Sequence, residues 1–186
     1  LAMAVVVAVA GRRSRVARAS AMGFGVVGGL FHLAYAPPFL LLEGTALTTP
    51  MAMSTLVGSL LLVAWAVAVA WSAPADWSWT MAAIVALYGM TTFCVTAGVL
   101  LGGEADGFLA GHVAATLCWI ALAAAVLRHA TKVPRAERSL PIIGGMAVVA
   151  AAMAKLFLFD LGTLDGIFRV VVFIAVGLAL LGMGTG

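Results

Sequence analysis

Charged residues are scarce in this sequence. Among its 186 residues only 9% are charged, ten Lys or Arg against seven Asp or Glu, while 65% are hydrophobic. The mean hydropathy is +1.19. A soluble domain of this length cannot hide that much apolar surface in its core. The composition therefore excludes a water-soluble globular protein and predicts that the chain lies in a lipid bilayer.

Several functional patterns are also absent. No face interleaves basic residues with aromatic ones, so we expect no nucleic-acid partner. There is no Gly-rich phosphate loop, no Gly-x-Ser-x-Gly elbow and no paired His motif on a helix, and no spacing matches a metal site, so we expect no metal and no cofactor. The two cysteines, Cys94 and Cys118, each lie inside an apolar run, which favours small buried side chains over a disulfide.

Long apolar runs are what the sequence has instead. About 20 apolar residues are needed for a helix to cross a bilayer, far more than a barrel strand requires. Runs of this kind predict an all-α polytopic transmembrane helical bundle with about six full spans, preceded by one truncated span at residues 1–10. Pro37 and Pro38 should end or kink the first full helix, since proline cannot continue one. Later spans are expected at residues 51–73, 77–101, 108–127, from Pro141 onward, and 167–183.

The domain organisation follows from the same runs. No soluble domain or low-complexity linker interrupts them, so we expect one transmembrane domain over residues 1–186. The chain begins inside an apolar run and ends without a polar tail, which favours the C-terminal fragment of a longer membrane protein.

The basic residues predict an orientation. Short loops rich in Lys and Arg mark the cytoplasmic side of a membrane. The loops Arg12–Arg18 and Arg128–Arg138 are separated by four expected spans, so both are predicted to be cytoplasmic. The loops that contain Glu43 and the pair Glu104 and Asp106 carry no Lys or Arg and fall on the opposite side. The sequence thus predicts a multi-pass protein of a bacterial inner (plasma) membrane with its carboxylates gathered outside.

Four ionisable residues stand out between two long apolar runs: Lys155, Asp160, Asp165 and Arg169. A charge at a helix centre costs roughly 2.5–3.5 kcal/mol on insertion, so such groups usually pair, reach the interface or serve a function. Asp165 and Arg169 are four apart and can pair on one helix face. Lys155 and Asp160 are five apart, a poor α-helical pair, so we expect Lys155 to pair across the hairpin or to extend toward the interface. Two interpretations stay open, a structural clasp or a site for a lipid head group, sugar or ion.

Two further sets of residues are candidates. Glu104, Asp106 and His112 could form an outer-face site, with His112 as a general acid or base, although a lone interfacial His is more often only hydrogen-bonded. His32 precedes the Pro37-Pro38 break, and broken helices mark binding sites in some transporters. A packed interhelical donor is the simpler interpretation of His32.

The segment from Lys155 to Arg169, with Phe173 and the run Gly177-Leu-Ala-Leu-Leu-Gly182, resembles the C-terminal signature of a bacterial family of predicted multi-pass membrane proteins, domain of unknown function 2339. The resemblance covers about residues 140–183. It implies long inner-membrane proteins with many helices, and it supplies no reaction.

Three functional hypotheses follow. The first is a structural or accessory subunit of a cell-envelope assembly, in contact with membrane lipids and protein partners through an extracytoplasmic polar hairpin. The second is an envelope enzyme acting on a lipid-linked substrate at the outer leaflet, with Lys155 and Arg169 holding an anionic head group. The third is a transporter that uses His32.

Overall fold

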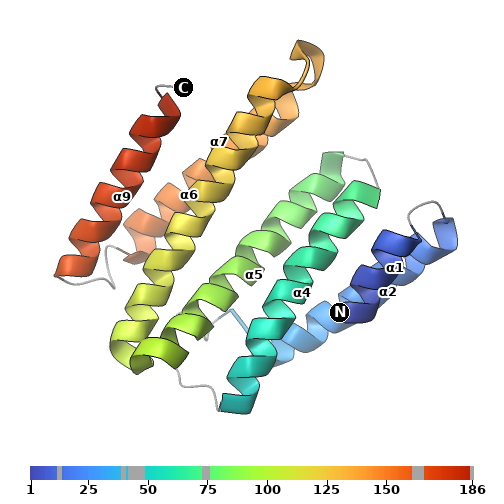
Figure 1. Ribbon diagram of the computed structural model, residues 1–186, viewed down its shortest axis with the longest axis horizontal. Coiled ribbons are helices and arrows are strands. Elements are labelled where there is room, and N and C mark those ends of the chain that lie inside the picture. Colours follow the sequence, from blue (N-terminus) through green and yellow to red (C-terminus); the bar gives the residue numbers. More distant parts are fainter. Residues whose placement is uncertain (12–13, 39–40, 42–48, 73–75, 161–165, 185–186) are drawn as a thin grey trace. The chain divides into compact units, whose positions relative to one another are not determined.

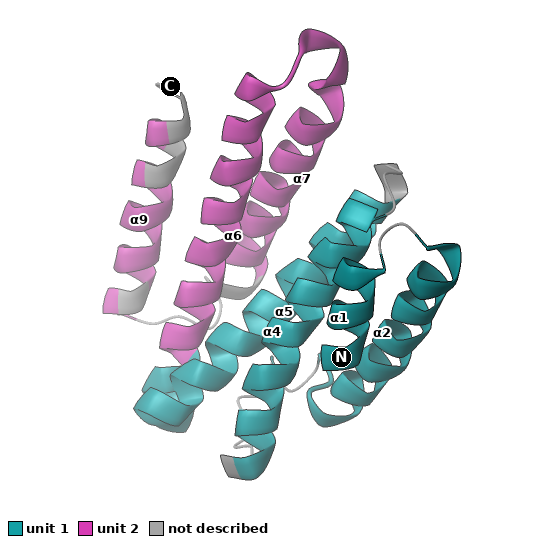
Figure 2. Cartoon of the chain, turned by 45° about the vertical axis from the view of Figure 1, so that its right-hand side comes forward, with its two compact units in different colours: residues 1–108 teal, residues 109–186 magenta. Residues whose placement is uncertain are grey.

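The structure is a computed structural model of the 186-residue chain (Figure 1). It describes every residue except 12–13, 39–40, 42–48, 73–75, 161–165 and 185–186. Most of the described residues are helical, with no strand among them, so the predicted all-α fold is confirmed. The chain divides into two compact units, residues 1–108 and 109–186 (Figure 2).

The first unit is built from α1 (Ala2–Ala10), α2 (Arg15–Tyr35), α4 (Thr49–Ser72) and α5 (Asp76–Gly102), followed by a π-helical turn, η1 (Gly103–Gly107). Within it α1 packs on α2 and α4, α2 packs on α4, and α4 packs on α5. Its buried positions are mostly alanine, threonine and serine, which let helix backbones approach closely in a membrane.

The ends of α2 follow from its sequence. Ser14 is extended, and its side chain accepts a hydrogen bond from the backbone N–H of Ala17 at 3.3 Å, as an N-cap does. The helix stops at Tyr35, with Ala36 as its C-cap, immediately before Pro37. The prolines therefore end the helix, as the sequence predicts.

Helices α2 and α4 run antiparallel. Three hydrogen-bonded pairs join them, Arg18 with Ser72, Trp65 with Ala21, and His32 with Ser59. Because the residue number falls along α4 as it rises along α2, the two helices point in opposite directions. Trp65 Nε1 donates to the carbonyl oxygen of Ala21 at 2.9 Å, and Gly25 leaves the space for the indole.

The second unit contains α6 (Phe108–Lys132) apart from its first residue, the 3₁₀ turn η2 (Arg135–Glu137), α7 (Ser139–Lys155), the π turn η3 (Leu156–Asp160) and α9 (Ile167–Gly184). Its apolar core draws on α6, α7 with η3, and α9, and its buried members are Val113, Ile120, Ala152, Leu156, Val172 and Val176. Helix α9 buries Val172 and Val176, four residues apart on one face, and exposes most of its other described side chains.

Among the described residues, four apolar segments are long enough to cross a membrane: Arg15–Tyr35, Pro50–Ser72, Ser78–Lys132 and Ser139–Leu158. The third has 55 residues and contains most of α5 and all of α6, each of which is longer than twenty residues. Gly103 separates them, since its φ of 81° lies in the left-handed region that a right-handed helix cannot pass through. In α9 the qualifying apolar part, Arg169–Leu178, is shorter. The total of six full crossings and their sidedness remain predictions.

Candidate functional site

The lysine of the polar segment reaches a neighbouring helix. Lys155 is the last residue of α7, and its Nζ donates to Thr116 Oγ1 at 2.8 Å and to the backbone oxygen of His112 at 3.3 Å, both on α6. Thr116 lies eight residues after Phe108, the first residue of α6, which is ~12 Å along the helix axis. The ammonium group therefore binds within the helical pair instead of only extending toward the interface.

The hydrogen-bonding roles of Lys155, Thr116 and the His112 carbonyl are compatible with one another. Thr116 is fully buried, and its hydroxyl donates to the His112 carbonyl at 3.1 Å, so its oxygen is left to accept from Lys155. An ammonium group has three donors and no acceptor, which suits two oxygen atoms of this kind. Hydrogen bonds that involve a charged partner contribute roughly 1.5–3 kcal/mol. The cluster of Lys155, Thr116 and His112, the α6–α7 clasp, thus joins two spans by a charge-assisted contact.

The π turn η3 follows Lys155 directly. A π turn bonds residue i+5 to residue i and is wider than an α-helical turn, so it shifts which positions share one face of the helix. The side chain of Asp160 and all of Asp165 lie outside the described residues, so the expected ion pairs stay predictions. Arg169 is exposed on the first turn of α9.

The expected outer-face group divides between the two units. Glu104 and Asp106 belong to η1 and are exposed, whereas His112 belongs to α6 and is 2% exposed. The backbone oxygen of His112 is the part that the α6–α7 clasp uses. Among the residues that the structure describes, no three His, Cys, Asp or Glu side chains are grouped closely enough to hold a metal ion.

His32 lies in a second polar cluster, in the first unit. It is 5% exposed, its Nε2 is 3.4 Å from Ser59 Oγ on α4, and its ring meets that of Tyr88 on α5 edge-on with centroids 6.1 Å apart. Tyr88 donates its hydroxyl to the carbonyl oxygen of Ala36. The interpretation of His32 as a packed interhelical group agrees with these contacts.

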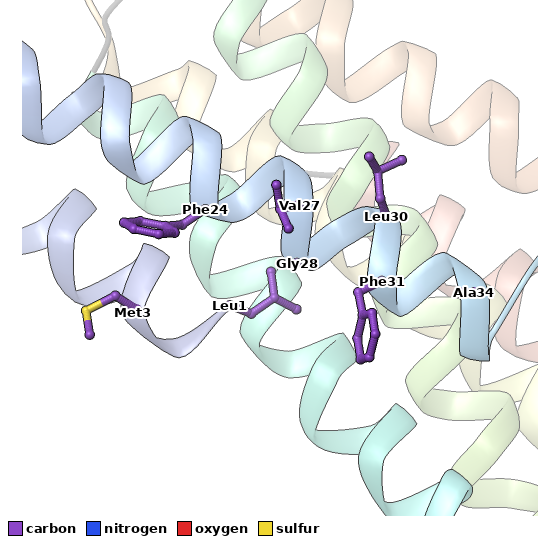
Figure 3. Close-up of a pocket in the computed structure, with 8 residues that line it drawn as sticks. All are labelled: Leu1, Met3, Phe24, Val27, Gly28, Leu30, Phe31 and Ala34. Atoms are coloured by element: carbon purple, nitrogen blue, oxygen red, sulfur yellow. The ribbon is translucent and has the colours of Figure 1, made fainter.

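An apolar groove lies between α1 and α2 in the first unit (Figure 3). Its volume is about 580 Å³, and apolar side chains of both helices line it, including Met3, Phe24 and Phe31. Such a lining offers no general base, nucleophile or ion ligand. The groove has the chemistry of a surface that contacts hydrocarbon.

The comparison with known families decides the affiliation of the chain. The family model described as "Predicted membrane protein (DUF2339)" matches residues 1–184. The chain belongs to this family. The match confirms the resemblance inferred from residues 140–183 and extends it over the first unit as well. Neither the curated proteins nor the solved structures contain a match to this DUF2339 chain.

Two parts of these clusters are missed by sequence reasoning. The acceptor of Lys155 on His112 is a backbone carbonyl, which every residue possesses and no side-chain pattern indicates. The sequence pattern does not indicate Ser59 and Tyr88 as site residues, because single hydroxyl groups are common in apolar helices. The four-residue spacing of Thr55 and Ser59 in α4 is a signal that could have identified a polar stripe.

Proposed function

We propose that this DUF2339 chain is a non-catalytic, polytopic component of a bacterial cell-envelope assembly, whose intramembrane polar groups tie helices together and whose loop carboxylates dock a protein partner. The membrane location and the family are established above. The structural role and the envelope assembly are the proposal.

The observation that supports the proposal is which atoms accept the interhelical hydrogen bonds of the polar side chains. Four interhelical hydrogen bonds of the described residues terminate on backbone carbonyl oxygens, and their donors are Arg18, Trp65, Tyr88 and Lys155. A catalytic or transport group must direct its donors and acceptors toward a ligand. Donors committed to the carbonyls of neighbouring helices instead stabilise helix packing, since interhelical hydrogen bonds hold membrane bundles together.

The docking part of the proposal rests on the acidic turn η1. Glu104 and Asp106 are exposed there, on a loop without Lys or Arg that the positive-inside rule predicts to lie outside the cytoplasm. Exposed charges at the edge of a protein interface increase the association rate and select the partner more than they add to the affinity. We therefore expect the partner to present a basic surface to Glu104 and Asp106.

The experiment compares complexes solubilised gently from native membranes. The wild-type chain is expected to run in native mass spectrometry with a partner at fixed stoichiometry, and the purified partner should bind it again. The double substitution Glu104→Gln with Asp106→Asn should abolish this complex while leaving the chain folded. Glu137→Gln, which removes an exposed carboxylate from the loop predicted to be cytoplasmic, is the matched control and should keep it.

Two results would contradict the proposal. One is a chain that migrates alone from native membranes, with no partner that rebinds. The other is turnover of a lipid-linked substrate by the purified chain, which would favour the alternative of an outer-leaflet enzyme.

A further inference from the structure

The last turn of α2, residues 32–36, is held on two sides by polar contacts. His32 reaches Ser59 on α4, and the carbonyl oxygen of Ala36 accepts the hydroxyl of Tyr88 on α5. His32 is 5% exposed and Ala36 3% exposed, so both contacts are shielded inside the first unit. Directly after this turn come Pro37 and Pro38, which cannot continue a helix. The turn is therefore fixed by these side contacts and not by further helix beyond it.

The hydrogen atoms of the His32 contact can be assigned from its neighbours. Ser59 donates its hydroxyl to the backbone oxygen of Thr55 at 2.7 Å, so its oxygen can only accept from the imidazole. Thr55 in turn donates to the backbone oxygen of Met51 at 2.8 Å. Nε2 of His32 must then carry the hydrogen, and the neutral ring has its lone pair at Nδ1.

That lone pair faces the backbone of α4. A Cβ atom built at Gly58 would lie 2.6 Å from Nδ1 of His32, so the ring fits only because position 58 has no side chain. A second proton on Nδ1 would point at this C–H surface. The imidazolium form would thus carry a donor without a good acceptor in the closed arrangement, which is costly inside a membrane.

Among the described residues, the helices that pack around His32 bring no carboxylate close to its ring, and Glu43 lies outside those residues. Helices α1 and α4 contain no ionisable side chain apart from the hydroxyl groups. On α5 the groups that titrate are Asp76, Tyr88 and Cys94. Asp76 is the first residue of that helix, twelve residues before Tyr88 and ~18 Å along the axis. Tyr88, which faces the ring, is neutral, and Cys94 lies six residues beyond it.

Helix α2 itself adds only cations and a phenol. Arg15 and Arg18 are on its first turn, and Arg18, fourteen residues before His32, is ~21 Å away. Tyr35 lies three residues after His32 and is exposed. The dipole of α2 favours a cation in its last turn, but this effect is small beside the cost of burying an unpaired charge.

We propose that the last turn of α2 is a proton-sensitive latch, which is closed on α4 and α5 while His32 is neutral and opens when His32 takes up a second proton at Nδ1. The step is the reversible uptake of a proton from hydronium in water, which forms the Nδ1–H bond and breaks one O–H bond, and no other bond changes. Opening frees the Ala36 carbonyl and exposes the polar side chains that face it. The chain can thereby change its surface in response to acidity.

The test measures how often Ala36 becomes accessible. In a chain with Cys94→Ala and Cys118→Ala, the substitution Ala36→Cys places a thiol at a buried position, and its labelling rate by a maleimide is divided by the rate in the unfolded chain at the same pH. If His32 titrates near its usual pKa of ~6.5 only in the open form, this ratio rises about tenfold from pH 7.5 to pH 5.5. With His32→Gln, whose amide can still donate to Ser59 but does not titrate, the ratio should be flat.

A second variant keeps the test decisive if His32→Gln fails to fold. Tyr88→Phe removes the other contact, so it should raise labelling at both pH values, about fivefold for a typical hydrogen bond, and keep the tenfold pH ratio. The proposal is overturned if labelling of the His32 chain does not change between pH 7.5 and pH 5.5. It is equally overturned if the His32→Gln chain shows the same pH dependence.

Discussion

The contact of Gly25 on α2 with Trp65 on α4 allows a sharp test of the packing. Gly25 is buried on α2, and a Cβ built there would overlap the indole of Trp65, whose Nε1 donates to Ala21. Gly25→Ala must therefore either push the indole out of its place or separate the two helices. In both cases the hydrogen bond to the Ala21 carbonyl is lost or lengthened.

The expected size of the effect combines three terms. Overpacking costs about 1–3 kcal/mol and the lost hydrogen bond about 0.5–1.5 kcal/mol, while the better helix propensity of Ala returns about 1 kcal/mol. The net loss in unfolding free energy should thus be about 0.5–3.5 kcal/mol, from the same three contributions. The sign depends on steric overlap, because propensity alone would make the variant more stable.

Gly23 provides the matched control. It lies on the same helix two residues earlier, and no atom is within 4 Å of a Cβ built there, so Gly23→Ala should be neutral or slightly stabilising. Unfolding free energies are measured by titrating the chain in mixed micelles with a denaturing detergent. The cost of Gly25→Ala should also shrink when Trp65→Ala is already present, because the overlap is then removed. Equal stabilities of the Gly23 and Gly25 variants would refute the reasoning.

Two further predictions concern the clasp and the orientation. Thr116→Val removes the hydroxyl acceptor of Lys155 and should lower the unfolding free energy of the chain by about 1–3 kcal/mol. The same change in a Lys155→Met background should cost clearly less. Additive effects in this double-mutant cycle would show that the contact does not couple α6 and α7. The orientation is tested with single cysteines placed in a cysteine-free chain in intact cells. Ala105→Cys should react with an impermeant thiol reagent, whereas Ser14→Cys and Ala136→Cys should react only after the inner face of the membrane is exposed. Labelling of all three positions from one side would overturn the predicted topology.

Most of the fold could be predicted because hydropathy alone specifies it. The span expected at residues 51–73 is α4, Thr49–Ser72, and a helix, α9 (Ile167–Gly184), lies where a span is expected at 167–183, although its qualifying apolar part is only Arg169–Leu178. Pro37 and Pro38 fixed the end of α2 for a local steric reason. Helix α6 extends to Lys132, five residues beyond the predicted end at Leu127, because Arg128 and Lys132 can remain helical in the interface, where a hydropathy pattern stops.

The polar contacts could be predicted only in part, for a different reason. Residue types show that Lys155 needs partners, but the π turn after it changes which residues share its face, and no apolar period indicates a shift from i+4 to i+5 bonding. The His32 cluster depends likewise on Gly58, whose missing side chain is what admits the ring. The contacts of Lys155 in the second unit and of His32 in the first unit are thus determined by the backbone geometry around each side chain. Substitutions that alter the backbone or the space beside it, such as those at Gly58 and Gly25, should therefore disturb helix association more than the exchange of one apolar residue for another on the lipid face.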